Sequence, residues 1–211
     1  RHDVVVITDD DCRVAPGWPA AMAATFDDPA VGVAFGAVTG LSGVAGAPLA
    51  VPPPGPAPPV TWAYANGAAM AVRRRAAIAV GGFDERLGPG APVHGEEHDL
   101  VLRLQEAGWE ARIADAPVVE HLEWRDDAET LANLVVYSKG AGAFGGAALR
   151  RDAPRGLRPA VRRARDQRPP WSHRDVAGAA FGPRTSAAFL VGLVHGLRLR
   201  PRRFVDGAAR K

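Results

Sequence analysis

Short β-branched runs alternate with helical patterns along residues 4–121 of this 211-residue chain. Such runs are typical of strands, and apolar residues three and four positions apart are typical of amphipathic helices. A chain that alternates the two is expected to form an α/β domain, here with a mixed, mostly parallel sheet flanked by helices. The run at residues 4–7 (VVVI) has no polar position, so we predict a buried, parallel strand there. Further strands are predicted at residues 31–38, 60–64, 68–72, 112–114 and 118–119, and helices at residues 16–26, 74–80 and 96–107.

Charge divides the chain into an acidic body and a basic tail. Residues 1–140 carry 10 Lys/Arg and 19 Asp/Glu (net −9), whereas residues 141–211 carry 16 Lys/Arg and 4 Asp/Glu (net +12). We expect a core domain over residues 1–125 and a helical, basic extension over residues 126–211. A basic tail suits phosphate, anionic lipid or nucleic acid, and a solvated arginine-rich segment is the plain alternative. Because its arginines are not interleaved with aromatic residues, we expect no nucleic acid.

The clearest helical pattern of the tail covers residues 185–199. A basic amphipathic helix can lie in a membrane interface, although packing on the domain explains the same pattern. Five apolar residues are predicted to share one face of this helix: Phe189, Leu190, Leu193, Val194 and Leu197.

Three aspartates, Asp9, Asp10 and Asp11, follow the run at residues 4–7. Ligands of open α/β sheets bind beyond the carboxyl ends of strands, and side chains at i and i+2 of an extended segment point the same way. Asp9 and Asp11 are therefore predicted to face one ligand, and Mg²⁺ or Mn²⁺ takes oxygen ligands of this kind. A solvated acidic turn explains the same residues without a ligand. Cys12, the single cysteine, has the chemistry of a soft ligand or a nucleophile, but no activating base is evident and it is interpreted as a packing residue. A single cysteine excludes an internal disulfide and fits a reducing compartment.

A second polar cluster, GEEHDL at residues 95–100, opens the helix predicted at residues 96–107. The helix dipole favours acids in a first turn, so capping explains one or two of them, but it does not need three. A carboxylate within reach of a hydroxyl can act as a general base, and the candidates are Glu96, Glu97 and Asp99. His121 follows the last predicted strand and is a candidate metal ligand, with His94 and His98 as rivals.

Four segments together resemble the family-2 glycosyltransferases of the GT-A fold. VVVITDDDCRVAPGW (residues 4–18) resembles the family's metal-site strand with its Asp-x-Asp, and ANGAAMAVRRRAAIAVGGFDE (residues 65–85) resembles its acceptor-side segment. GEEHDLVLRLQEAG (residues 95–108) resembles the family's Glu-Asp box, and His121 stands where many members carry a histidine. Each motif alone is weak evidence, but the four occur in the family's order and spacing.

The resemblance implies an inverting transfer of a sugar from a nucleotide-diphosphate donor to an acceptor hydroxyl, with a divalent metal (Mn²⁺ or Mg²⁺). It implies a glycan or a lipid-linked acceptor, and a bacterial, cytoplasmic enzyme of polysaccharide, glycolipid or cell-envelope synthesis. Contact of such an enzyme with the inner face of the membrane rests on the basic tail alone, and packing of the tail helix on the domain is the alternative. Carried over by position, Asp9 and Asp10 belong to the donor site, and Asp11 and His121 to the metal. Glu97 falls on the base position, where it replaces the family's aspartate, so Glu96 and Asp99 stay rivals.

The sequence departs from the family's pattern at its start. Family members carry further strands before this point, and those strands hold the nucleoside base. We therefore expect a truncated piece of a longer enzyme, with residues 4–7 as a central strand that presents an exposed apolar edge, or a product that has lost donor binding. Two alternatives remain: a non-catalytic GT-A-like binding module, and a haloacid-dehalogenase-type phosphatase with Asp9 as nucleophile. The phosphatase motif has Thr or Val at the position of Arg13, which argues against the phosphatase alternative.

Overall fold

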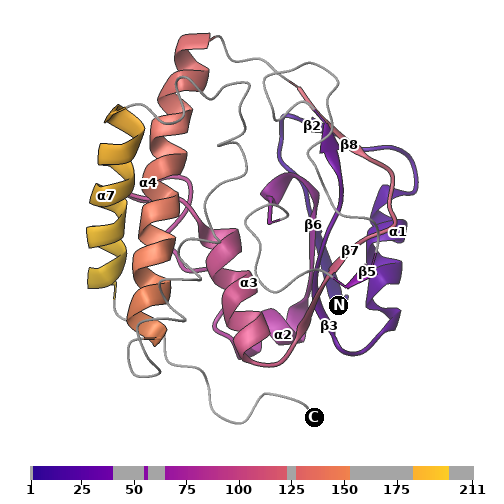
Figure 1. Cartoon of the computed structure of the whole chain (residues 1–211). Helices are drawn as coiled ribbons and strands as arrows, with labels where there is room; N and C mark the ends of the chain where they lie inside the picture. Colours follow the sequence, from indigo (N-terminus) through magenta and orange to yellow (C-terminus); the bar gives the residue numbers. More distant parts are fainter. Residues whose placement is uncertain (1, 40–54, 57–64, 123–126, 153–182, 200–211) are drawn as a thin grey trace. The chain divides into compact units, whose positions relative to one another are not determined.

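The computed structural model describes residues 2–39, 55–56, 65–122, 127–152 and 183–199, which form two compact units. The described residues of the first unit lie within residues 2–82 and 100–122, and those of the second within residues 83–99 and 127–199 (Figure 1). The strand predicted at residues 60–64 lies outside the described residues. The domain division predicted at residue 125 stays a prediction.

The first unit contains a mixed five-stranded sheet. Its strand order is β1-β6-β3-β7-β5, built from β1 (Val4–Ile7), β6 (Met70–Arg73), β3 (Val31–Phe35), β7 (Glu110–Ile113) and β5 (Gly55–Pro56). β6 pairs antiparallel with both β1 and β3, β5 pairs antiparallel with β7, and β3 pairs parallel with β7. The prediction of a mostly parallel sheet is therefore wrong for the described strands. An apolar run encodes burial, but it does not encode the direction of the neighbouring strand.

β1 differs in particular from its prediction. It lies at the end of the strand order, its one neighbour among the described strands is β6, and that pairing is antiparallel. Val5 is 42% exposed, and the other three residues of β1 are half-buried. The run at residues 4–7 is thus neither fully buried nor parallel. Its place at the edge of the described strand order agrees with the predicted exposed edge.

Helices cover both faces of this sheet, as the α/β prediction requires (Figure 1). Side chains alternate along β6, so Met70 and Val72 pack on one face while Ala71 packs on the other. The first face is covered by α2 (Arg74–Ala79) and by the part of α3 (Glu96–Glu106) from Leu100 onward. The second is covered by α1 (Trp18–Ala24) and the 3₁₀ turn η1 (Thr25–Asp27) that follows it.

A small second sheet of the first unit carries the candidate site. Its order is β2-β8-β4, from β2 (Cys12–Arg13), β8 (Val119–His121) and β4 (Val38–Thr39). β8 pairs antiparallel with β2 and parallel with β4. The 3₁₀ turn η2 (Gly67–Ala69) leads into β6, and Asn66 caps it by accepting a hydrogen bond from the Ala69 N–H at 2.8 Å. Because β2 follows β1 and β8 follows β7, the pairing of β2 with β8 brings the segment after β1 next to the segment after β7.

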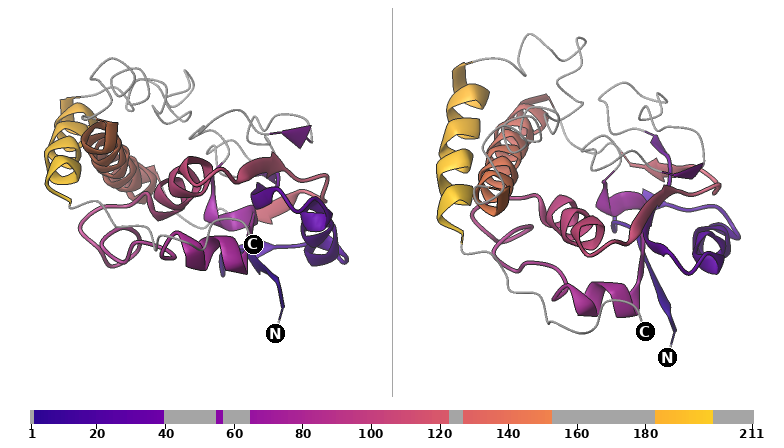
Figure 2. Two further views of the ribbon diagram at one scale, coloured as in Figure 1. Left: turned by 90° about the horizontal axis from the view of Figure 1, so that it is seen from below. Right: turned by 60° about the horizontal axis from the view of Figure 1, so that its bottom comes forward.

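The second unit contains two long helices, α4 (Asp127–Asp152) and α7 (Pro183–Arg198), which lie side by side in all views (Figures 1 and 2). They run in the same direction, because Gly192 approaches Lys139 and Gly196 approaches Ala143. A Cβ added at either glycine would overlap a carbonyl group of α4, so these glycines set the close approach of the two backbones. Among the described helices, none combines the length and the apolar character needed to cross a bilayer.

The helix predicted at residues 185–199 is confirmed as α7, and its predicted apolar face is divided between half-buried and exposed positions. Phe189 and Leu193 are half-buried. The exposed apolar residues of α7 are Leu190, Val191, Val194 and Leu197. The helix therefore uses part of its apolar surface to pack within the unit and exposes the remainder.

Candidate functional site

The three aspartates after β1 lie in a turn. The Cys12 N–H donates a hydrogen bond to the Asp9 carbonyl at 3.2 Å, which closes a four-residue turn with Asp10 and Asp11 in its centre. Asp9 and Asp10 are exposed, whereas Asp11 and Cys12 are half-buried. The prediction that Asp9 and Asp11 point the same way from an extended segment is therefore wrong in its geometry. The turn directs Asp11, rather than the whole acidic run, toward the small sheet.

The register of β2 against β8 places Cys12 directly opposite His121. The Leu122 N–H donates to the Asp11 carbonyl at 2.8 Å, a bond that flanks the Cys12–His121 pair. Cys12 and His121 therefore form a non-hydrogen-bonded pair of the antiparallel ladder. Opposite side chains approach each other most closely in such a pair. Strand pairing thus brings two potential metal ligands together from distant parts of the sequence.

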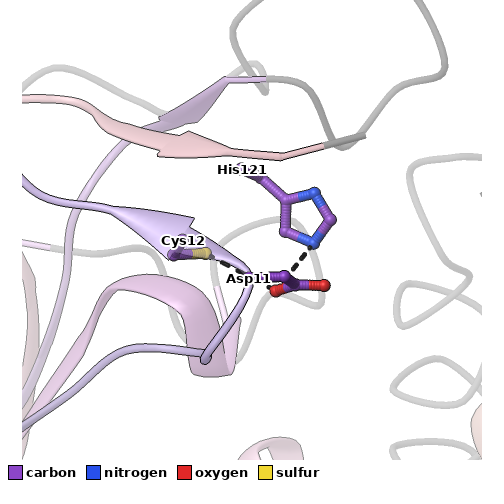
Figure 3. A group of neighbouring side chains, drawn as sticks. All are labelled: Asp11, Cys12 and His121. Carbon is purple, nitrogen blue, oxygen red and sulfur yellow. Dashed lines mark hydrogen bonds and ion pairs between the residues drawn. The ribbon is translucent and has the colours of Figure 1, made fainter. Parts of the chain in front are cut away.

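Asp11, Cys12 and His121 form a compact group of possible ligand atoms (Figure 3). Nε2 of His121 lies 3.4 Å from Oδ1 of Asp11, and Sγ of Cys12 lies 4.0 Å from the same oxygen. One ligand atom from each residue lies within 4.8 Å of the other two. The His121 side chain is only 6% exposed and that of Asp11 19% exposed, so the group is held by its surroundings.

This donor set fits a divalent cation. Carboxylate oxygen, imidazole nitrogen and thiol sulfur are all common protein ligands for first-row divalent metals, and three protein ligands leave a coordination position open. The structure brings together the two residues predicted to bind metal, Asp11 and His121. That they bind one stays a prediction.

The state of the Cys12 thiol follows from its surroundings. Burial raises the pKa of Cys12 above its usual value, and the negative charge of the Asp9 carboxylate raises it further. Without a cation, Cys12 is therefore protonated at neutral pH. Binding of a cation by its sulfur would displace that proton, so the affinity would increase with pH.

The acidic helix start belongs to the second unit, and its three carboxylates differ in environment. Glu96 turns back on the preceding loop, where Oε2 accepts a hydrogen bond from the Gly95 N–H at 3.0 Å. Its carboxyl group also lies beside Gly88, where an added Cβ would come within 2.8 Å of Cδ. Glu96 thus acts as a local cap, which is the plain explanation considered for one of the acids.

Asp99 is the most buried of the three, with 1% of the residue exposed. It contributes, after Asp84, to raising the pKa of the Arg86 guanidinium. Asp84 itself is buried and holds Arg86 through two hydrogen bonds of 2.8 and 2.5 Å. Asp99 therefore belongs to the charged group that fixes the loop after Gly82.

Glu97 is the remaining carboxylate, and its side chain is 21% exposed. Its Oε2 lies 3.8 Å from Nδ1 of the buried His98. Of the three predicted candidates, Glu97 combines partial exposure with a neighbouring titratable ring. That it acts as a general base stays a prediction.

The rival histidines pack on α4. The His94 ring makes an edge contact with Tyr137 at a centroid distance of 5.9 Å, and the His98 ring lies 6.0 Å from that of Phe144. Both histidines belong to the second unit, whereas His121 and Asp11 belong to the first. His121 is therefore the histidine whose contacts identify it as a partner of Asp11.

From the sequence, a soft-ligand role for Cys12 is an alternative to the preferred packing interpretation. Its position next to Asp11 was visible, but the pairing of β2 with β8 was not, and that pairing brings the sulfur close to His121. The packing interpretation is also supported, because Cys12 contacts the core beneath α1. Cys12 thus packs against the core, and its sulfur also lies close to Asp11 and His121.

Comparison with known proteins gives a distant structural similarity. No family model and no curated protein matches the chain. A structure that resembles it is GalNAc-T7 with UDP, GalNAc and Mn²⁺, at 16% sequence identity and a TM-score of 0.40, over 83% of this chain. The chain covers 40% of that protein. A similarity this distant assigns neither a family nor an activity.

Proposed function

We propose that this chain carries the metal centre and donor site of an inverting glycosyltransferase, which moves a sugar from a nucleotide-diphosphate donor to an acceptor hydroxyl. The observation that carries the proposal is the 3.4 Å approach of Asp11, from the turn after β1, to His121, from the end of β8. The sequence resemblance places both residues at the metal, and their contact supports that role. A solvated acidic turn does not require a buried histidine against one of its carboxylates.

In this proposal Asp11 and His121 would hold a divalent cation. When bound, the cation supplies positive charge that stabilises the diphosphate as it leaves the sugar. Asp9 and Asp10, the exposed residues of the same turn, accept hydrogen bonds from hydroxyl groups of the donor. The turn therefore divides its tasks, with one carboxylate facing inward to the cation and two facing outward to the donor.

Glu97 is the proposed general base, and Glu96 and Asp99 are the alternatives. Glu97 takes the proton of the acceptor hydroxyl while that oxygen forms a bond to the anomeric carbon. The bond from this carbon to the diphosphate breaks, and attack from the opposite side inverts the anomeric configuration. The partial exposure of Glu97, the loop hydrogen bond of Glu96 and the burial of Asp99 support this choice.

We further propose that the acceptor is a glycan or a lipid-linked molecule of bacterial cell-envelope synthesis, used at the inner face of the membrane. The support is the exposed part of α7, where Leu190 and Val191 are 60% and 57% exposed. Basic groups lie at the end of that helix, because Arg198 is in its last turn and Nη1 of Arg150 donates to the Leu197 carbonyl at 2.7 Å. Apolar and basic groups in this arrangement suit an anionic lipid surface.

Liposome co-sedimentation tests this membrane proposal. We expect the chain to sediment with anionic vesicles more than with neutral ones, and Leu190→Asp with Val191→Asp to reduce that binding. Ser186→Asp, on an exposed position of the same helix, is the control for the added charge. Equal and negligible binding to both vesicle types would refute the membrane contact.

The transfer reaction is tested with a panel of nucleotide sugars, in the presence of Mn²⁺ and in excess chelator. We expect donor cleavage or transfer that depends on the cation and is lost in Asp11→Asn while the far-ultraviolet circular dichroism is retained. Full turnover in chelator would contradict the proposal. Cation-dependent donor binding without any turnover would instead indicate the non-catalytic binding module, and release of inorganic phosphate from phosphate esters would indicate the phosphatase.

A further inference from the structure

The sulfur of Cys12 faces the same space as Asp11 and His121 (Figure 3). The sequence predicts an oxygen-rich site for Mg²⁺ or Mn²⁺, and the structure adds a sulfur atom 4.0 Å from Oδ1 of Asp11. A thiol within a carboxylate and imidazole group changes which cation the group prefers, because sulfur is a softer ligand than oxygen.

The spacing of the three ligand atoms is close to that of a tetrahedral site. Bonds of about 2.0 to 2.3 Å to oxygen, nitrogen and sulfur separate neighbouring ligand atoms by about 3.3 to 3.8 Å. The His121 and Asp11 atoms already meet this condition at 3.4 Å. The most separated atoms of the group lie within 4.8 Å, so the sulfur needs to move by only about 1 Å to complete three ligands.

The backbone holds the sulfur in this place. Cys12 and His121 are opposite each other in the antiparallel β2–β8 pair, and the Leu122 N–H bond to Asp11 fixes that register. Glu120 precedes His121 in β8, and its side chain is 58% exposed. It pairs with Arg13 at 3.2 Å on the other face of the two strands. Cys12 and His121 therefore share one face of the strand pair, whereas Arg13 and Glu120 lie on the other. Asp11 reaches the same two side chains from the turn before β2.

We propose that Cys12 is the third protein ligand of this centre and that it makes the site selective for Zn²⁺ or Co²⁺ over Mg²⁺ and Mn²⁺. On binding, the thiol releases its proton to solvent, and the resulting thiolate donates an electron pair to the cation. The three ligands leave one position open for a water molecule or a ligand oxygen. This inference deepens the proposed function because it concerns the same metal centre, but it does not require that sugar transfer occurs.

Cobalt is a direct probe of sulfur ligation, because a Co²⁺–thiolate bond absorbs in the near ultraviolet by charge transfer. We expect the intact 211-residue chain, reduced and free of other metals, to develop this band on titration with Co²⁺, and excess Zn²⁺ to abolish it. Absence of the band at saturating Co²⁺ would overturn the proposal without any variant. The band is independent of turnover, so it can appear in a chain that transfers no sugar.

Cys12→Ser provides the second arm, because it keeps the size of the side chain and exchanges the soft ligand for a hard one. We expect it to abolish the band and to weaken Zn²⁺ and Co²⁺ at least about tenfold, with a much smaller change for Mn²⁺. Glu120→Gln is the matched control, since it removes a charge next to His121 on the opposite face and should leave the band unchanged. Equal loss of affinity for all four cations in Cys12→Ser, or loss for none, would contradict selective thiolate ligation.

Because Cys12 is the single cysteine, a thiol reagent reports on it alone. We expect Zn²⁺ to slow alkylation of the wild-type chain strongly, Mn²⁺ to slow it little, and His121→Ala to remove the protection by Zn²⁺. Equal alkylation rates with and without saturating Zn²⁺ would contradict the proposal. Loss of cation-dependent nucleotide binding with protection retained would instead contradict the glycosyltransferase proposal alone.

Discussion

At the scale of single residues, the acids of the α3 start have different environments although they are neighbours in sequence. Glu96 caps its own loop, Asp99 is buried near Arg86, and Glu97 is partly exposed beside His98. A base has to reach a bound hydroxyl, whereas a cap or a buried ion partner has to stay where it is. The three acids therefore have three different surroundings within one helical turn.

Substitution of Glu97 tests its proposed role as the general base. Glu97→Gln is expected to lower kcat by about two to four orders of magnitude with donor affinity little changed, because loss of a general base affects the chemical step. The same change is expected to leave the melting temperature within about 2 °C of wild type, because the side chain is partly exposed. Steady-state kinetics and thermal unfolding measure the two effects.

Asp99→Asn is the matched variant. We expect it to lower the melting temperature, because it removes a buried charge that faces Arg86. A Glu97→Gln variant that turns over normally, beside an Asp99→Asn variant that is folded and inactive, would assign the base to Asp99 instead.

The sequence predicts the grouping of Asp11 with His121, but it does not predict the positions of Cys12 and Asp9. Asp11 and His121 were identified because their motifs resemble those of a known family, and their contact agrees with a shared role. The position of the Cys12 sulfur depends on the register of two short strands that no local pattern specifies. Asp9 was expected to face the same way as Asp11, but a turn replaces the extended segment on which that expectation rested.

At the scale of elements, sequence patterns located strands and helices better than they paired them. The helices predicted at residues 74–80 and 96–107 are observed as α2 and α3, each within about one residue of its predicted end. The run at residues 4–7 is a strand, but its antiparallel pairing with β6 was not predicted. Hydrophobic periodicity reports which face is buried, whereas strand direction is decided by partners far along the chain.

The α4–α7 contact leads to a second prediction, in which the sign of the effect is informative. At an exposed position within a helix, Gly→Ala stabilises the folded state by about 1 kcal/mol, because glycine loses more backbone entropy on folding. At Gly196 the added methyl group would overlap the Ala143 carbonyl of α4. We therefore expect Gly196→Ala to destabilise the second unit, by about 1–3 kcal/mol as typical for overpacking.

Urea unfolding followed by circular dichroism measures this change. Gly192→Ala should behave in the same way, since its added Cβ would meet the Lys139 carbonyl. Ser186→Ala, on an exposed position of α7, is the control and should be neutral or slightly stabilising. A Gly196→Ala variant more stable than wild type would show that the two backbones are not in close contact in solution.

At the scale of the whole molecule, the chain combines a unit with a candidate metal centre and a unit with an acidic helix start and two long helices. The acidic and basic halves of the sequence suggest two tasks, and the proposed function gives them two: donor and cation chemistry for residues in the acidic half, and contact with an anionic surface for the basic half. The first task would depend on a cation at Asp11 and His121, because without it the acidic turn would repel a diphosphate.

Calorimetric titration of nucleoside diphosphates into the 211-residue chain tests this dependence most directly. The titration is made with a divalent cation, with excess chelator, and with Asp11→Asn and Glu120→Gln in place of the wild-type chain. We expect saturable binding that requires the cation, falls at least about tenfold in Asp11→Asn, and is unchanged in Glu120→Gln. Binding of equal strength in chelator, or binding that Asp11→Asn leaves intact, would contradict the account.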